Sequence, residues 1–332
     1  MAAFRSVVVF ATDGVSTFDI GGIGAIFADR LEAELPSFDF TVCAERPGPL
    51  LTDLGLSMHV THGLDRIDKA DLVILMPGYD TRPDPTPELV TALLSANRRG
   101  AIIAAFCTGT HLLAATGLLD GRRASTHWHL LEDFATLYPE VTVTADTLYI
   151  DEGLVITGAG IVAGIDMCLH LLRREHGAAV ANAVARAMVA APHRDGDQAQ
   201  RIDRSVPGSN EDELFTGVIH WAHANLDRPL LVNDLAAQAL MSPRTFARRF
   251  RAAMGTTPHS WLLAQRLNRA EELLETTDLR IEEIARLVGY NSVAVFREQF
   301  TKRRGLSPRD HRRRHDRRSE PDASVEVFRT AG

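Results

Sequence analysis

Short apolar runs alternate with longer amphipathic stretches over the first 192 residues. The apolar runs predict strands at Ser6–Phe10, Asp39–Cys43, Asp71–Met76, Ala101–Phe106 and Leu154–Thr157. The stretches between them predict helices near Asp19–Glu34, Pro87–Arg98, Thr108–Thr116 and Gly160–His176. Strands that are apolar at nearly every position are typical of a sheet buried on both faces, and their alternation with helices indicates parallel pairing. The pattern therefore predicts an α/β domain with a mostly parallel sheet and helices on both faces.

The pattern changes after residue 192. Residues 193–212 read HRDGDQAQRIDRSVPGSNED, which has almost no apolar positions and contains a Pro-Gly pair, as expected of a linker. Beyond it the strand signals end and helical periodicity continues to about residue 318. The predicted organisation is an α/β domain over 1–192, a linker over 193–212, an all-α domain over 213–318 and a flexible tail over 319–332.

An internal repeat dominates the predicted all-α domain. Phe246, Phe250, Gly255 and Pro258 recur fifty positions later in the same order and spacing. Each copy predicts a helix, a tight turn and a second helix. In the first copy Ser242 is placed to cap the second helix, whose phenylalanines share its buried face. The domain is therefore expected to contain two helix-turn-helix units.

The face opposite the phenylalanines is basic in the first copy. At about 100° per residue this face carries Arg244, Thr245, Arg248 and Arg251. An arginine can donate two hydrogen bonds to guanine in the major groove, so such a helix can read base sequence. The alternative is a structural helical hairpin with a solvated arginine face, but the repeat and its basic setting favour DNA binding.

Residues 214–315 resemble the DNA-binding domain of the AraC/XylS family. The matching stretches are LAAQALMSPRTFARRF, GTTPHSWLLAQRLNRAEELL, IEEIARLVGYNSVAVFREQF and RRGLSPRDHRR. The resemblance implies that helices Pro243–Met254 and Ser292–Arg304 enter successive major grooves of double-stranded DNA, bridged by a helix near His259–Glu275. The second reading helix offers few base donors, so we expect it to position the protein through phosphate contacts. The expected contacts are Arg297, Lys302, Arg303 and Arg304.

The distribution of charge supports this division. The whole chain carries a formal charge of −7, but residues 1–210 carry −10 and residues 211–318 carry +5. A basic segment suits a polyanionic partner, which the overall acidity conceals.

A cysteine follows the fourth predicted strand. Cys107 ends the run AIIAAFC and precedes a predicted helix, as a nucleophile does in a strand–nucleophile–helix turn, where the helix dipole can stabilise a thiolate. Residues 4–190 resemble the ThiJ/PfpI group through VVVFATDGVSTFDIGG, DLVILMPGYD, AAFCTGTHLLAATGLLDGRRASTHW and TGAGIVAGIDMCLHLL. The proteases of that group place a histidine after the cysteine, where this chain has Thr108. His111 and His127 are nearby but not at that position, so a Cys–His pair is not expected.

The predicted role of this domain is to bind a small-molecule effector. The expected pocket residues are Asp19, Cys107, Thr108, His127 and Trp128, at the carboxyl ends of parallel strands. Three alternatives stay open. First, Asp19, Cys107 and Thr108 match the set that isonitrile hydratases use, so the domain could be catalytic. Second, the domain could serve only to dimerise. Third, Cys107 could sense oxidants.

Other classes of function find little support. No apolar run reaches the ~20 residues needed to cross a bilayer, so a cytoplasmic protein is expected. Three cysteines make no disulfide framework, the scattered histidines suggest no metal site, and Gly21-Gly22-Ile23-Gly24 lacks the spacing of a nucleotide-binding loop. No cofactor is expected. The predicted partners are double-stranded DNA, an effector, a second copy of the chain in a homodimer, and RNA polymerase.

Overall fold

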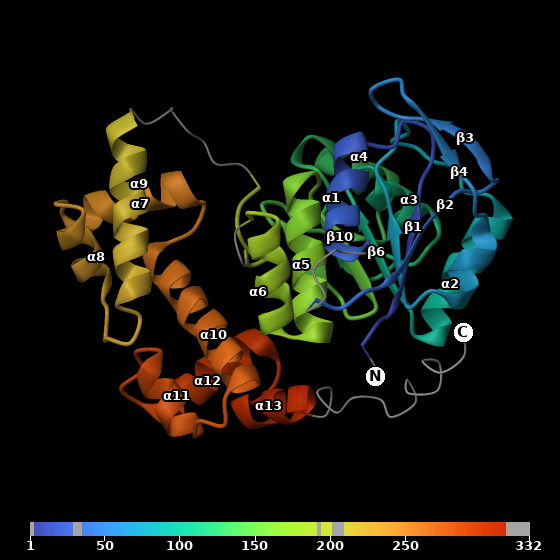
Figure 1. Cartoon of the computed structure of the whole chain (residues 1–332). Coiled ribbons are helices and arrows are strands. Elements are labelled where there is room, and N and C mark those ends of the chain that lie inside the picture. The colour runs from blue at the N-terminus through green and yellow to red at the C-terminus, as the bar shows by residue number, and fades with distance from the viewer. Residues whose placement is uncertain (1–2, 29–34, 191–193, 201–208, 317–332) are drawn as a thin grey trace. The chain divides into compact units, whose positions relative to one another are not determined.

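The computed structural model describes residues 3–28, 35–190, 194–200 and 209–316. These residues divide into two compact units, an N-terminal α/β unit and a C-terminal helical unit (Figure 1). Each unit is described by itself. Among the described residues, no helix is both long enough and apolar enough to cross a membrane.

A six-stranded sheet forms the centre of the α/β unit, in the order β2-β1-β5-β6-β10-β9. Every neighbouring pair is parallel except β9 and β10. The strands are β1 (Ser6–Phe10), β2 (Asp39–Cys43), β5 (Leu72–Leu75), β6 (Ile102–Phe106), β9 (Tyr149–Asp151) and β10 (Val155–Gly158). The mostly parallel sheet expected from the apolar runs is confirmed, and β1 and β2 have the predicted bounds.

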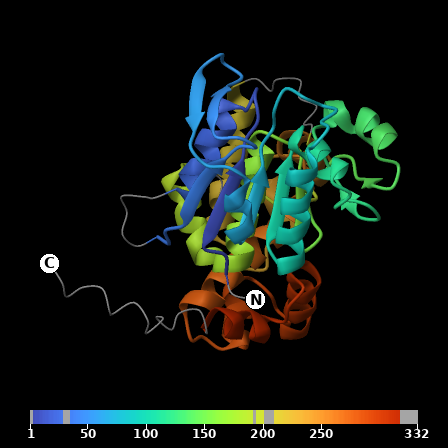
Figure 2. The ribbon, with the colours of Figure 1, turned by 90° about the vertical axis from the view of Figure 1, so that its right-hand side faces the viewer.

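Helices cover both faces of this sheet. Alternate residues of β1 point to opposite faces, with Val7 and Val9 in one apolar core and Val8 and Phe10 in the other. The first core packs against α1 (Thr17–Phe27), α5 (Val162–His176) and α6 (Ala178–Ala187). The second packs against α2 (Pro87–Arg99), α3 (Gly109–Ala115) and α4 (Leu131–Leu137). Figure 2 views the unit from the side that α2 covers.

Short elements that the periodicity did not predict complete the unit. The pattern is weak there because two of the strands have only two residues and the hairpin β3–β4 is largely exposed. These elements are β3 (Gly48–Leu51), β4 (Ser57–Val60), β7 (Arg123–Ala124), β8 (Thr142–Val143) and the 3-10 helices η1 (Leu64–Lys69) and η2 (Trp128–Leu130).

The segment predicted as a linker is only partly one. The backbone N–H of Leu148 donates to Gly196 O at 2.7 Å, and Gln200 Nε2 donates to Ser125 Oγ at 3.1 Å. Residues 194–200 therefore pack on the α/β unit. The first helix of the second unit begins at Ser209, inside the predicted linker, and residues 201–208 and the predicted tail from 319 lie outside the described residues.

The helical unit contains the two predicted helix-turn-helix copies. Its helices are α7 (Ser209–Ala224), α8 (Val232–Gln238), α9 (Pro243–Met254), α10 (Pro258–Thr276), α11 (Ile281–Leu287), α12 (Val293–Arg304) and α13 (Pro308–Asp316). The predicted cap at Ser242 is confirmed, because the Thr245 N–H donates to Ser242 Oγ at 3.2 Å, and Ser292 caps α12 in the same way, with the Val295 N–H donating to its Oγ at 3.4 Å.

Helix α10 takes part in both copies (Figure 1). Its first turns pack with α7, α8 and α9 in a core that contains Phe246 and Phe250, and its later turns pack with α11 and α12 in a core that contains Phe296 and Phe300. All four phenylalanines are fully buried. The buried faces of α9 and α12 therefore fix which face of each helix is turned outward.

The turn of the second copy is one residue longer, and the two turns have different residues at a left-handed position. Gly289 has φ +80°, and a Cβ there would lie 2.4 Å from Leu226 O, so only glycine fits. The first copy has Leu240 at this position, with φ +53° and a side chain that is 92% exposed. The first turn therefore has backbone strain that the second avoids.

The Leu240→Gly substitution is expected to raise the free energy of unfolding by about 1 kcal/mol, because relief of the left-handed strain exceeds the added chain entropy of glycine. Urea denaturation measures this difference. Ala252→Gly is the control, since Ala252 is also exposed but lies inside α9, and it should lower the free energy of unfolding by about 1 kcal/mol instead. Equal effects of the two substitutions would contradict the assignment of strain to Leu240.

Candidate functional site: a DNA interface and an effector cavity

The outward face of α9 is a row of exposed arginines. Arg244, Arg248 and Arg251 are exposed, while the opposite face is buried through Phe246 and Phe250. Thr245 is half-buried, and its Oγ1 accepts a hydrogen bond from Ser242 Oγ at 2.8 Å. The arginines form the surface that a major-groove reader requires, whereas the hydroxyl of Thr245 takes part in the helix cap.

The outward face of α12 is different in kind. Ala294 and Val295 are exposed near its start, and Glu298 is exposed one turn later. None of these side chains can donate a hydrogen bond to guanine. Helices α9 and α12 therefore repeat each other in their buried anchors but not in their outward chemistry.

The four basic residues predicted to contact phosphates differ in their exposure and in their partners. Lys302 is exposed, and Arg303 is half-buried. Arg297 is exposed and forms an ion pair with Glu282 at 2.9 Å, which DNA could exchange for a phosphate. The fourth residue, Arg304, lies inside the protein.

Arg304 is held by two side chains of α10. Its Nε lies 2.7 Å from Glu271 Oε1, and its Nη2 donates to Asn268 Oδ1 at 2.8 Å. The side chains of Arg304 and Glu271 are 12% and 3% exposed. A phosphate contact would strip Glu271 of its buried partner at a large cost, so this geometry indicates a structural ion pair between α10 and α12.

In the α/β unit, Cys107 occupies a tight turn between β6 and α3. Its φ is +53°, an unusual conformation for a residue other than glycine. Its N–H donates to Gly158 O at 3.0 Å, and its carbonyl accepts from Thr126 Oγ1 at 2.7 Å. The backbone geometry is that of the predicted strand–nucleophile–helix turn.

The electrostatic setting of Cys107 does not favour a thiolate. Burial is the main cause that raises the pKa of the Cys107 thiol, and the charge of Asp19 adds to it, while the Thr108 N–H opposes both. Burial also raises the pKa of Asp19, a nearly fully buried residue of α1. A helix dipole can lower a thiol pKa, but α3 has only seven residues and burial has the larger effect on Cys107.

The side chain of Thr108 is held by a neighbouring loop. Its Oγ1 accepts from the Gly78 N–H and donates to Gly78 O, both at 3.0 Å. His111 is fully buried, packs edge-on against Phe134, and has its pKa lowered by burial. Neither residue is arranged to activate Cys107.

Alkylation of Cys107 by iodoacetamide is expected to accelerate with rising pH through pH 9 without reaching a plateau, because only the thiolate reacts and burial raises the pKa above the usual value. Peptide mass spectrometry follows the reaction. Cys107→Ser identifies the signal, and Cys43 and Cys168, which are buried, should react more slowly. A plateau below pH 7 would show a reactive thiolate and restore the oxidant-sensor and catalytic hypotheses.

A cavity of about 530 Å³ opens beside Thr108. That volume is within the range of small-molecule sites. Acidic side chains outnumber basic ones on its wall: Asp13, Glu45, Asp80 and Asp84 face a single arginine, Arg46. Loops after β1, β2 and β5 supply these residues, which sequence reasoning missed because separate loops carry them.

The other predicted effector residues, Asp19, Cys107, His127 and Trp128, do not line this cavity. A Cβ on Gly160 would lie 2.9 Å from Cys107 Cβ and 3.6 Å from His127 Cδ2, so Cys107 and His127 flank this glycine. Trp128 and His127 are ring neighbours, with centroids 5.6 Å apart. Burial is the main cause that lowers the pKa of His127. Of the five residues predicted to bind the effector, Thr108 is the one that lines the described cavity.

These features define a two-part regulator, with a helix-turn-helix pair and a ligand-sized cavity. Comparisons with known proteins agree with this description. Residues 235–314 match the model of a helix-turn-helix domain, and residues 5–174 match the model of the DJ-1/PfpI family, which spans half of the chain. The chain belongs to the AraC-type transcriptional regulators that carry a DJ-1/PfpI domain, and it is a DNA-binding transcription regulator.

Relatives along most of the chain are also regulators. The HTH-type transcriptional regulator CdhR of Pseudomonas aeruginosa is 31% identical over 285 residues, covering 86% of this chain and 84% of CdhR. The HTH-type transcriptional regulator GlxA of Rhizobium meliloti is 29% identical over 295 residues, covering 86% of this chain and 89% of GlxA. A crystal structure of an AraC family transcriptional regulator from Pseudomonas putida covers 55% of this chain and 99% of that chain, with 22% identity and a TM-score of 0.48.

Proposed function

We propose that α9 reads base sequence and that α12 mainly positions the protein on the DNA backbone. The observation that carries this proposal is the exposed row Arg244, Arg248 and Arg251 on α9, set against Ala294, Val295 and Glu298 on α12. Arginine is the side chain best suited to guanine in the major groove. We assign the phosphate contacts to Arg297, Lys302 and Arg303, and we give Arg304 a structural role because of its pairing with Glu271.

A selection of bound sequences from random DNA tests this proposal. The selected motif should be strongly constrained over the base pairs that α9 faces and weakly constrained one helical turn away, where α12 lies. Equal constraint in both halves would overturn the unequal roles of the two helices.

We further propose that a small molecule bound in the α/β unit controls DNA binding. The cavity beside Thr108 supports this by its volume and by its position at the carboxyl ends of parallel strands. Four acidic side chains against one arginine favour a positively charged effector. Asp19, Cys107, His127 and Trp128 remain a predicted extension of the site.

Calorimetric titration with matched pairs of small amines and carboxylates tests the preference for a cation. An amine is expected to give a saturable heat, and Asp80→Asn with Asp84→Asn should weaken its binding by at least about tenfold, the effect of losing about 1.4 kcal/mol of attraction. Asp120→Asn, in the loop after α3, is the control. Tight binding of carboxylates and none of amines would contradict the proposal.

We also propose that the regulator acts as a homodimer on paired half-sites and contacts RNA polymerase there. Pairing two copies of a reading unit multiplies specificity without a new contact type. Analytical ultracentrifugation at micromolar concentration tests the dimer, and a protein that stays monomeric with and without DNA would overturn it.

The second candidate function is hydration of a small molecule at Cys107. The strained turn of Cys107 favours it, because such strain is common at catalytic residues. The raised thiol pKa and the engagement of Thr108 with Gly78 do not favour it. Regulation therefore remains the function that the geometry supports best.

A further inference from the structure

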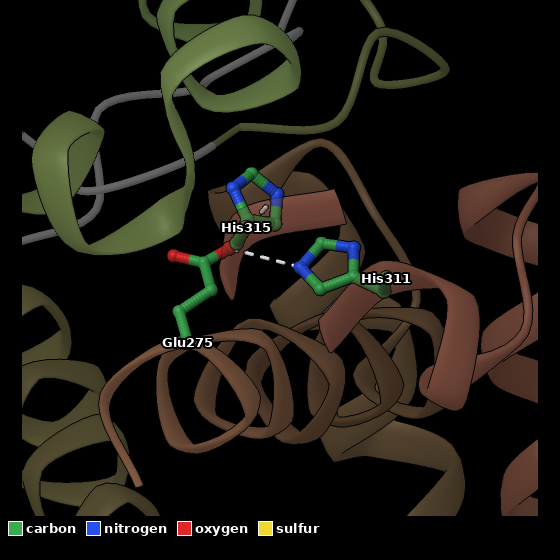
Figure 3. A group of neighbouring side chains, drawn as sticks. All are labelled: Glu275, His311 and His315. Carbon is green, nitrogen blue, oxygen red and sulfur yellow. Dashed lines mark hydrogen bonds and ion pairs between the residues drawn. The ribbon is translucent and has the colours of Figure 1, made fainter. Parts of the chain in front are cut away.

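Three metal-binding side chains meet at the end of the helical unit. His311 and His315 are four residues apart on α13, so their rings lie on one face of that helix. Glu275 reaches them from the last turn of α10, as Figure 3 shows. Their ligand atoms all lie within 4.8 Å of one another. The sequence offered one signal for this group, the four-residue spacing of the histidines, but not the partner on α10.

Two distances within this group are close to those of a zinc site. Tetrahedral Zn²⁺ with ligand bonds of about 2.0–2.2 Å separates its ligand atoms by about 3.3–3.5 Å. Glu275 Oε1 lies 2.9 Å from His311 Nε2 and 3.6 Å from His315 Nε2. Shifts of a few tenths of an ångström, within the reach of side-chain rotation, would bring both distances to that value.

Burial and charge also favour a cation at this place. The side chains of Glu275, His311 and His315 are 5%, 10% and 9% exposed. A buried carboxylate needs a positive partner. A proton on one imidazole can supply it, but a divalent ion would neutralise the carboxylate and engage both histidines at once. Two imidazole nitrogens with one carboxylate oxygen are a donor set typical of zinc.

We propose that Glu275, His311 and His315 bind one Zn²⁺ ion, which joins α13 to α10. The consequence reaches the second reading helix, because the His311 ring packs edge-on against Phe300 at 5.5 Å, and Phe300 is a core anchor of α12. Arg312 on α13 already bonds Leu279 O just beyond α10. The ion would therefore stiffen the packing that holds α12.

Titration of Zn²⁺ into metal-free, untagged full-length protein, in competition with a coloured chelator, tests the proposal. Wild type is expected to bind one ion per chain tightly, and Glu275→Gln and His315→Ala to bind it at least about 100-fold more weakly, since losing a ligand costs no less than losing a supporting residue. His259→Ala is the matched control, because His259 is exposed on α10, and it should bind as wild type does.

Two checks keep the outcome decisive. Glu275→Gln preserves side-chain size, so it stays informative even if His315→Ala fails to fold by circular dichroism. Co²⁺ in place of zinc should give a visible spectrum without a thiolate band, since all three cysteines lie in the α/β unit. Unchanged zinc affinity in Glu275→Gln, or a thiolate–cobalt band, would overturn the proposal.

Discussion

The Arg248→Ala variant is expected to lose base preference while it keeps most of its nonspecific affinity for DNA. Arg248 is exposed at the centre of the outward face of α9, about one turn after Arg244 and two residues after the fully buried Phe246. A bidentate contact between arginine and guanine contributes about 1–3 kcal/mol of discrimination, which corresponds to about 5- to 150-fold. Fluorescence anisotropy with the selected site and with a scrambled duplex measures the ratio of the two affinities.

Lys302→Ala is the matched control for this prediction. Lys302 is exposed on α12, which we assign to backbone contacts, so its loss should weaken both duplexes equally. It should also reduce the slope of log affinity against log salt by about 1, as the loss of one phosphate contact does. If Arg248→Ala behaved like Lys302→Ala, Arg248 would be a phosphate contact and α9 would not read sequence through it.

Phe250→Ala is expected to lower the free energy of unfolding of the helical unit by about 3–5 kcal/mol. Large core phenylalanines cost this much because their removal leaves a cavity as well as losing burial. Phe250 is fully buried and lies 5.3 Å from Phe246, 6.0 Å from Phe215 and 5.7 Å from Trp261, measured between ring centroids. Urea denaturation followed by tryptophan fluorescence reports on this core through Trp261.

Leu231→Ala is the control for the loss of an apolar side chain. Leu231 is 64% exposed in the same unit, so its substitution should change the stability by less than about 0.5 kcal/mol. A loss of stability in Phe250→Ala as small as that of Leu231→Ala would mean that α9 is not anchored by its phenylalanines, and the outward face assigned to it would no longer follow.

The parts of the fold that the sequence predicted are those with a local signal. The apolar run Ser6–Phe10 is a strand buried on both faces, as a run that is apolar at nearly every position predicts. The recurrence of Phe246 and Phe250 as Phe296 and Phe300 predicted two similar units, and all four side chains are buried in matching cores. Periodicity and repetition are sufficient here because both can be read from the order of residues without knowing which distant residues meet.

The parts of the fold that the sequence could not predict depend on partners that are distant along the chain. Residues 194–200 are polar, as in a linker, yet their backbone and side-chain groups find partners such as Leu148 and Ser125. Four basic residues of α12 were expected to contact phosphates, but one of them, Arg304, pairs with the buried Glu271 on another helix. No local pattern reveals which basic side chain a fold will bury.

In the candidate effector site, too, local features were predictable from the sequence and features that depend on distant residues were not. The turn at Cys107 was predictable from a strand followed by a helix, and its positive φ is the physical form of that pattern. The direction in which the pKa of the thiol shifts was not predictable, because it depends on the depth of burial and on Asp19, which α1 supplies. The acidic wall of the cavity combines residues from several loops, which only the folded chain brings together.

Capture of fragmented genomic DNA tests the central claim, that this chain is a sequence-reading regulator through α9. The full-length protein, with and without a small-molecule extract of the cells that encode it, is mixed with fragments at ~150 mM salt and excess competitor, where nonspecific phosphate binding fades. Wild type should enrich a few fragments that share a motif, and a variant with both Arg244→Ala and Arg248→Ala should enrich none. Enrichment of the same fragments by that variant, or none by wild type under either condition, would contradict the account.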